Sequence, residues 1–128
     1  MPTVLIVDDE WIVAHYIEVA LARLDCRCVV VRSAAQALAA VTGERPSLVI
    51  MDVSLGCEDG IELSRRIRES ADVPVVFLTA QSDEATIRRA LATRPAGYLV
   101  KPVDGSALLR LAERLLTGPP AQAGRIPP

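Results

Sequence analysis

The chain has 128 residues, of which 51% are hydrophobic and 23% charged, as expected of one soluble globular domain with its own core. A net charge of −2 argues against direct nucleic-acid binding, which normally needs a basic excess. No apolar run approaches the roughly 18 residues of a membrane span, and the N-terminus lacks the pattern of a signal peptide, so we expect a cytoplasmic protein.

The N-terminal part of the chain begins with two strand–helix units. The apolar run 4–7 suits a strand that is buried on both faces of a parallel sheet. A helical pattern follows over residues 10–24, where apolar side chains fall on one stripe. A valine-rich strand is expected over residues 26–32. Ser33 then begins a second helix, and Gln36 is placed to complete its capping box.

The middle of the chain carries the third unit. Residues 47–51 form a third apolar strand that ends at Asp52. The segment 54–60 contains two glycines and is expected to be a loop. We interpret Asp59-Gly60, at its end, as a turn and the start of a third helix over residues 61–69.

The fourth unit follows a proline. Its strand, over residues 75–78, ends at Thr79. Ser82 and Asp83 are candidate N-caps, because short polar side chains accept hydrogen bonds from the first free N–H groups of a helix. The helix that they begin is expected to reach about Thr93.

The fifth unit completes the domain, which we place at residues 1–118. A strand is expected over residues 97–100, and Asp104 or Ser106 can cap the last helix. The proline-rich residues 119–128 are predicted to be a disordered tail. Five alternating strands and helices predict an α/β fold with a doubly wound, five-stranded parallel sheet and five helices.

The cysteines and the one histidine are interpreted as ordinary structural residues. Cys26, Cys28 and Cys57 cannot all pair within one chain, and we expect reduced thiols. His15 points roughly opposite the apolar stripe of its helix, which is typical of a solvated side chain.

Polar residues stand where the predicted strands end. Asp8 and Asp9 follow the first strand, Asp52 the third, Thr79 the fourth and Lys101 the fifth. Binding sites in open parallel sheets form beyond the carboxyl ends of the strands. We therefore expect these five side chains to gather at one edge of the sheet.

Such a cluster has a defined chemistry. Three neighbouring carboxylates repel one another, and a hard cation such as Mg²⁺ relieves that repulsion. A metal ion and a lysine together can hold the oxygens of a phosphoryl group. One carboxylate can then act as the nucleophile and form an acyl phosphate.

With these residues the chain resembles the receiver domain of two-component response regulators, of the kind that includes the chemotaxis regulator. The match spans about residues 3–117, and the combination of Asp8-Asp9, Asp52, Thr79 and Lys101-Pro102 carries it. The resemblance implies a flavodoxin-like fold with strand order 2-1-3-4-5.

The resemblance also implies a set of metal ligands and an acceptor. Asp52 matches the aspartate that accepts the phosphoryl group. Asp9 matches the acid that binds Mg²⁺ directly, and Asp8 its neighbour that acts through water. Ser54 matches the position whose backbone carbonyl completes the metal shell.

Further positions match the switch. Thr79 corresponds to the hydroxyl that turns toward the phosphoryl group, Lys101 to the lysine that pairs with it, and Tyr98 to the aromatic that moves inward. The peptide bond before Pro102 matches one that is cis in the family. A departure is Gly56, which stands where the family often has proline.

The implied function is a signalling switch, and the family catalyses only its own phosphorylation and slow dephosphorylation. A sensor histidine kinase or a histidine phosphotransferase would donate the phosphoryl group. The face of the fourth helix, fifth strand and fifth helix would then regulate a protein partner or a tethered output domain, and a homodimer is left open.

Several alternatives are left open. The chain can be a stand-alone regulator, a phosphorelay shuttle, or a receiver excised from a larger regulator or hybrid kinase, since too few residues follow Leu116 for a helix-turn-helix module. A phosphatase of the haloacid dehalogenase type would have an acid in place of Ser54. A flavodoxin-like electron carrier would need flanking aromatics, and only 3% of the residues are aromatic.

Overall fold

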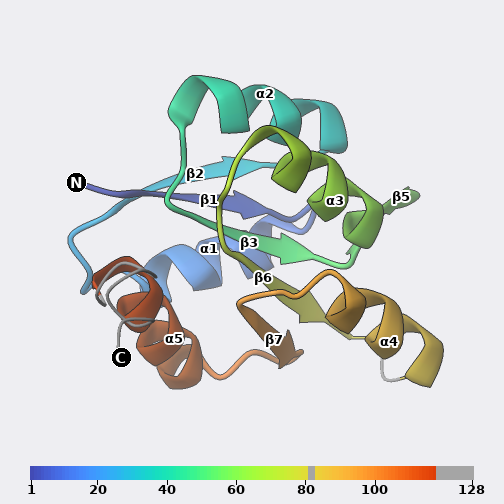
Figure 1. Cartoon of the computed structure of the whole chain (residues 1–128). Helices are drawn as coiled ribbons and strands as arrows, with labels where there is room; N and C mark the ends of the chain where they lie inside the picture. Colours follow the sequence, from blue (N-terminus) through green and yellow to red (C-terminus); the bar gives the residue numbers. More distant parts are fainter. Residues whose placement is uncertain (81–82, 118–128) are drawn as a thin grey trace, which may run out of the picture.

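The computed structural model describes residues 1–80 and 83–117 of the chain. Its centre is a parallel sheet of five strands in the order β2-β1-β3-β6-β7 (Figure 1). These strands are β1 (Thr3–Val7), β2 (Arg27–Val31), β3 (Leu48–Asp52), β6 (Val75–Thr79) and β7 (Gly97–Val100). The helices are α1 (Trp11–Ala20), α2 (Ala34–Glu44), α3 (Gly60–Ser70), α4 (Glu84–Ala92) and α5 (Gly105–Thr117). The predicted five-stranded order 2-1-3-4-5 is confirmed, with β6 and β7 as its fourth and fifth strands.

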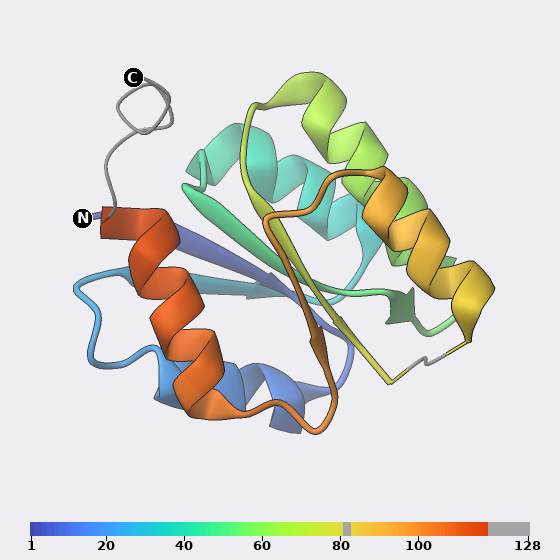
Figure 2. The ribbon, with the colours of Figure 1, turned by 60° about the horizontal axis from the view of Figure 1, so that its bottom comes forward.

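Helices cover both faces of the sheet. Helices α2, α3 and α4 lie on one face, and α1 and α5 lie on the other (Figures 1 and 2). A hydrophobic core lies on each face of the sheet. Side chains of a strand point alternately to the two faces, so Leu5 and Val7 belong to the core under α2 and α3, and Val4 and Ile6 to the core under α1 and α5. Burial on both faces explains why β1 and β3 have continuous apolar sequences. Within the described part of the chain, every helix is too short or too polar to cross a bilayer.

The first helix is shorter than the apolar pattern predicts. Helix α1 ends at Ala20, not near Leu24, and tighter turns follow, with the N–H of Leu24 donating to the carbonyl of Leu21 at 2.9 Å. Leu21 is nevertheless fully buried, and Leu24 packs against the core shared by α1 and α5. The apolar stripe therefore continues past the point where the helical hydrogen bonds stop.

The segment after Asp52 is also more regular than a loop. Residues 54–60 were predicted to have no secondary structure, but they contain a short antiparallel hairpin of β4 (Ser54–Leu55) and β5 (Glu58–Asp59). Gly56, with φ of 61°, provides its left-handed turn residue. Strands of two residues carry too little sequence for an alternating pattern, so the prediction missed them.

The helix caps largely follow the sequence. Ser33 Oγ accepts from the N–H of Gln36 at 3.2 Å, as a capping box requires. The return bond differs: Gln36 Oε1 accepts from the N–H of Arg32, not from that of Ser33.

The later helices each begin at an aspartate. Asp83 accepts from the N–H of Thr86 at 3.0 Å and caps α4. Asp104 accepts from the N–H of Ser106 at 2.9 Å, so Asp104 and not Ser106 caps α5. The other candidate cap, Ser82, and the expected tail over residues 119–128 lie outside the described residues.

Gly60 is the position where a side chain is least tolerable. Its N–H donates to the carbonyl of Val53 at 2.7 Å, and a Cβ built on it would lie 2.1 Å from the carbonyl oxygen of Asp52. We expect Gly60→Ala to lower the free energy of unfolding by about 1–3 kcal/mol or more, because rigid backbone would have to move.

Gly43→Ala in α2 is the matched control, because no atom lies within 4 Å of its Cβ position. It should be neutral or stabilise the protein by up to about 1 kcal/mol. Urea unfolding of both variants measures the difference. Equal stability of the two variants would contradict the close approach of Gly60 to the backbone of Asp52 at the end of β3.

Candidate functional site

The polar residues that follow the strands meet at one edge of the sheet. All five strands run in the same direction, so their carboxyl ends lie together (Figure 1). A pocket of about 330 Å³ opens there. It is lined by Asp9, Glu10, Asp52, Ser54, Gly56, Ala80 and Lys101.

Lys101 lies at the centre of the charged groups. Its Nζ donates to Asp52 Oδ2 at 2.8 Å and to Glu10 Oε1 at 3.2 Å, and it lies 3.6 Å from Asp8 Oδ2. Burial by itself would lower the pKa of Lys101. The hydrogen bond and charge of Asp52, together with the two other carboxylates, outweigh burial and raise that pKa, so the ammonium stays charged.

Asp8 is the most buried acid of the group, with 1% of its surface exposed. Its Oδ1 accepts from the N–H of Glu10 at 2.9 Å. Its Oδ2 has no hydrogen-bond partner among the described residues. Burial raises the pKa of Asp8 to about 6, although the hydrogen bond from Glu10 and the charge of Lys101 oppose the shift. Lys101 Nζ is 3.6 Å from this oxygen, too far for a hydrogen bond, so a bound cation or a proton would stabilise it further.

We expect Asp8→Asn to raise the free energy of unfolding of the metal-free protein at pH 7 by about 1–3 kcal/mol. The ordinary pKa of 3.8 rises to about 6 in the fold, so the native state binds more protons than the unfolded chain between these values. Wild-type stability should therefore fall as the pH rises through this window. The asparagine variant lacks that fall, so near pH 4 its free energy of unfolding should differ little from that of wild type. Urea unfolding in a chelator at several pH values tests this, and parallel pH profiles would contradict it.

The acidic residues fit a hard cation. One carboxylate oxygen from each of Asp8, Glu10 and Asp52 lies within 4.8 Å of the others. This set consists of oxygen atoms alone, and one of them, Asp8 Oδ2, is buried without a hydrogen bond from the described residues. Mg²⁺ occupies sites of this kind. Sequence reasoning missed Glu10, although its position directly after the acid pair and before a helix could have indicated it.

Asp9 and Ser54 line the same pocket. Asp9 lines the pocket, but its carboxylate is outside the three-carboxylate cluster, and its Oδ2 lies 3.3 Å from the Cβ position of Gly56. The N–H of Ser54 donates to Asp52 Oδ1 at 3.0 Å. The hairpin therefore begins with a direct contact to the Asp52 carboxylate.

The expected switch residues lie beside Asp52 on the next strands. Asp52 pairs in register with Leu78, so Thr79 is one position farther along β6, and its side chain is fully buried. The carbonyl of Thr79 accepts from the N–H of Lys101 at 2.8 Å. Lys101-Pro102 is a cis peptide bond, which confirms that prediction.

Tyr98 lies on β7, two positions before Val100, the residue that pairs with Thr79. It pairs with Phe77 and packs against the core that α2, α3 and α4 cover. Its hydroxyl is buried and has no hydrogen-bond partner among the described residues. The ring therefore already lies against the side of the sheet that carries α4.

The cysteines and the histidine stand apart from this site. Cys26 and Cys28 are half-buried free thiols, and burial raises the pKa of Cys28 to about 12. A thiol of that pKa is a poor nucleophile and a poor metal ligand. His15 is exposed, with Glu18 3.9 Å away, as predicted for a solvated helix residue.

Comparison with known proteins identifies the family. The profile of the response regulator receiver domain matches residues 4–113. The chain belongs to this family.

Among relatives of this receiver domain, the transcriptional regulatory protein AfsQ1 of Streptomyces coelicolor is 33% identical over 108 residues, which are 84% of the chain and 48% of AfsQ1. An uncharacterized response regulatory protein of Vibrio cholerae, VC_A0850, is 35% identical over 117 residues, which are 88% of the chain and 44% of that protein. The chain thus spans about half the length of the curated relatives it matches.

Solved structures give the same assignment. The receiver domain of a modulated diguanylate cyclase from Desulfovibrio desulfuricans superposes with a TM-score of 0.81 at 31% identity, covering 91% of this chain and 94% of that one. A response regulator from Chloroflexus aurantiacus gives a TM-score of 0.81 at 30% identity, covering 91% and 98%. Receiver domains serve phosphorylation-based signalling and bind Mg²⁺ at an acidic pocket, and this receiver domain has such a pocket.

Proposed function

We propose that this receiver domain is a switch whose phosphoacceptor is Asp52. The supporting observation is the environment of its carboxylate, which is only 5% exposed. Oδ2 is 2.8 Å from Lys101 Nζ, and Oδ1 accepts from the N–H of Ser54 at 3.0 Å. The pocket beside it is open to a donor. Both carboxylate oxygens are thus oriented by donors beside an open pocket, as suits a positioned nucleophile.

The proposed reaction is phosphoryl transfer from a phosphohistidine. An oxygen of Asp52 attacks phosphorus, a P–O bond forms, and the P–N bond to the imidazole breaks. Lys101, charged throughout, pairs with an oxygen of the transferred group. A bound Mg²⁺ would supply charge neutralisation for the clustered carboxylates and the phosphoryl oxygens.

We assign Asp9, Asp52 and the backbone carbonyl of Ser54 as direct Mg²⁺ ligands, with Asp8 acting through water. All three direct ligands line the pocket, which supports the assignment. Glu10 is a further candidate because its carboxylate is close to those of Asp8 and Asp52.

We expect Asp9→Ala to weaken Mg²⁺ binding by about tenfold or more, the range found when the coordination of a metal site is disturbed. It should at the same time raise metal-free stability slightly, since one of the crowded charges is gone. Trp11, the only tryptophan and two residues after Asp9, can report Mg²⁺ titrations by its fluorescence.

Two further variants sharpen the result. Glu10→Ala tests the alternative acid, and Glu113→Ala on α5 is the control for loss of a distant charge. An unchanged Mg²⁺ affinity in Asp9→Ala with a loss in Glu10→Ala would transfer the direct role to Glu10.

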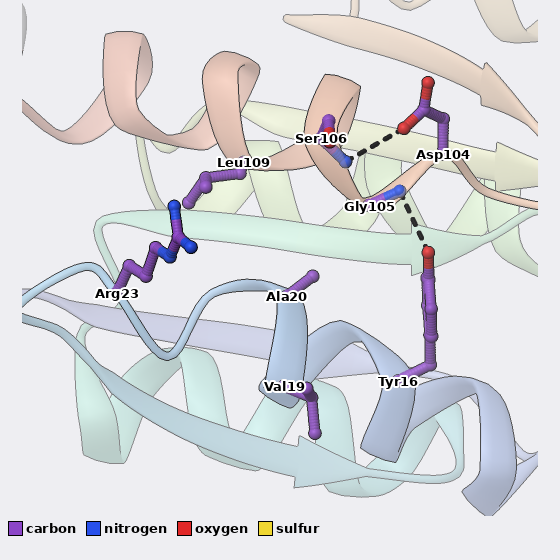
Figure 3. Close-up of a pocket in the computed structure, with 8 residues that line it drawn as sticks. All are labelled: Tyr16, Val19, Ala20, Arg23, Asp104, Gly105, Ser106 and Leu109. Atoms are coloured by element: carbon purple, nitrogen blue, oxygen red, sulfur yellow. Dashed lines mark hydrogen bonds between the residues drawn. The ribbon is translucent and has the colours of Figure 1, made fainter.

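The phosphodonor is proposed to be a sensor histidine kinase or a histidine phosphotransferase. Helix α1 starts next to the pocket and exposes several large apolar side chains, namely Trp11, Ile12, Tyr16 and Val19. An apolar surface that continues from the acceptor pocket supports docking of a protein donor there. Figure 3 shows the neighbouring pocket between α1 and α5, where the hydroxyl of Tyr16 accepts from the N–H of Gly105 at 2.9 Å.

The output is proposed to be a change in the face formed by α4, β7 and α5. That face would regulate a protein partner or a tethered output domain, or form a homodimer. The regulators that this chain resembles are about twice its length, which supports an output domain in those proteins. We propose residues 1–118 as the receiver unit and, since the expected donor is a cytoplasmic kinase module, the cytoplasm as its place.

A further inference from the structure

Helix α4 is joined to α3 and to the residue that precedes α3 by two arginine contacts, both in the C-terminal part of α4. At the C-terminal end of α4, Arg68 of α3 donates to the carbonyls of Thr93 at 2.7 Å and Arg94 at 3.1 Å. On α4 itself, Arg89 forms a hydrogen-bonded ion pair with Asp59, the residue that precedes α3. Arg68 and Arg89 thus connect the two helices.

Asp59 makes two kinds of contact at once. Its Oδ1 accepts from the N–H groups of Ile61 at 2.9 Å and Glu62 at 3.3 Å and caps α3. Its Oδ2 accepts from Arg89. Burial tends to raise the pKa of Asp59, but these hydrogen bonds prevail and lower it, so the carboxylate is ionised at neutral pH.

The same aspartate is connected to the phosphoacceptor. Asp59 belongs to β5 and pairs with Ser54 of β4, whose N–H donates to Asp52 Oδ1. On its other side the hairpin is held by Glu58, which accepts from the N–H of Ala34 at the start of α2 at 2.9 Å. Ser54 and Asp59 are direct partners in this hairpin of two residues per strand, so we expect a displacement of Ser54 to be passed on to Asp59.

We infer that the Asp59–Arg89 pair is a positioning contact that couples the acceptor carboxylate to α4 through the β4–β5 hairpin. The inference rests on the proposed function, because it needs ligands to act at Asp52. It is a second route to α4, separate from the proposed route through Thr79 and Tyr98. Coupling by contiguous contacts requires that both ends respond to each other.

The chain offers a matched control next to Arg89. Arg88 pairs with Glu84 at 3.0 Å within α4, and both side chains are more than 70% exposed, at 75% and 79%. Arg88→Gln therefore removes the same charge and the same type of ion pair without touching the hairpin. Arg89→Gln removes the link, and Asp59→Asn keeps a capping oxygen for α3 while it loses the charge.

The experiment measures the response to beryllofluoride with Mg²⁺ in wild type and the three variants. Amide hydrogen exchange over residues 84–92 reports α4, and titration gives the beryllofluoride affinity. We expect the exchange response of α4 to fall about threefold in Arg89→Gln and Asp59→Asn, as suits a partly exposed pair, and to stay at the wild-type value in Arg88→Gln. The affinity should change by a similar factor, because coupling is reciprocal.

The double variant provides the internal check. If the two residues act as one pair, the double variant Asp59→Asn and Arg89→Gln should lose no more of the α4 exchange response than either single variant loses. A response in Arg89→Gln equal to that in Arg88→Gln would overturn the inference while leaving the proposed function standing. Failure of wild type to bind beryllofluoride would instead overturn the proposed function and this inference with it. Should Asp59→Asn lose α3, Arg89→Gln, which leaves the cap intact, decides the outcome.

Discussion

Phosphoramidate or acetyl phosphate with Mg²⁺ is expected to add one phosphoryl group to the wild-type protein and none to Asp52→Asn. The amide that replaces the carboxylate has no comparable nucleophilic oxygen, so labelling should be lost altogether. Intact-mass measurement of both proteins under identical conditions gives the result. This is the largest effect we expect from any single substitution in the chain.

The control for this experiment is Asp59→Asn. Asp59 lies in the same hairpin but does not line the pocket, and its carboxylate contacts Arg89 and the start of α3. It should keep its label. Labelling of Asp52→Asn at the wild-type level would refute the assignment of Asp52 as the acceptor. If only Asp59→Asn lost the label, Asp59 would be the acceptor instead.

Thr79→Ala is expected to accept the phosphoryl group and to lose most of the change in the α4–β7–α5 face. In the proposed switch the Thr79 hydroxyl donates to an oxygen of phosphorylated Asp52. A charge-assisted hydrogen bond of this kind is worth about 1.5–3 kcal/mol, enough to shift a two-state equilibrium roughly ten- to a hundredfold. Thr79 is fully buried at the end of β6, so little water competes for that bond.

Amide exchange over residues 84–101 with beryllofluoride measures this loss. Thr79→Ser, which keeps the hydroxyl and loses only a methyl group, is the matched control and should respond like wild type. If Thr79→Ala responded like Thr79→Ser, the hydroxyl would not carry the signal. The hairpin route through Asp59 and Arg89 would then be the favoured link to α4 among the contacts of the described residues.

The order of strands and helices was predictable because the relevant patterns are local. A strand buried on both faces must be continuously apolar, as in β1 and β3, and caps such as Asp83 act within three residues of their own position. Strand-end placement of Asp8, Asp52 and Lys101 follows directly from the assignment of parallel strands. The sequence pattern by itself therefore predicted the alternation of strands and helices and the edge at which the site forms, whereas the strand order followed from the resemblance to receiver domains.

Other features depended on contacts between distant segments. Helix α1 ends at Ala20 because the chain must turn back toward β2, whereas the buried side of Leu21 and Leu24 extends the apolar pattern beyond that end. The β4–β5 hairpin is too short for a sequence pattern, and the two residues of β5 contact the start of α2 and helix α4.

The charged contacts of the site also depend on segments that are distant in the sequence. A glutamate after an acid pair and an arginine in a basic run look like ordinary surface residues in the sequence. Only the packed fold brings Glu10 to Lys101, 91 positions away, and Arg89 to Asp59, 30 positions away. The energy of such pairs depends on distance and burial in three dimensions, which residue spacing along the chain does not specify.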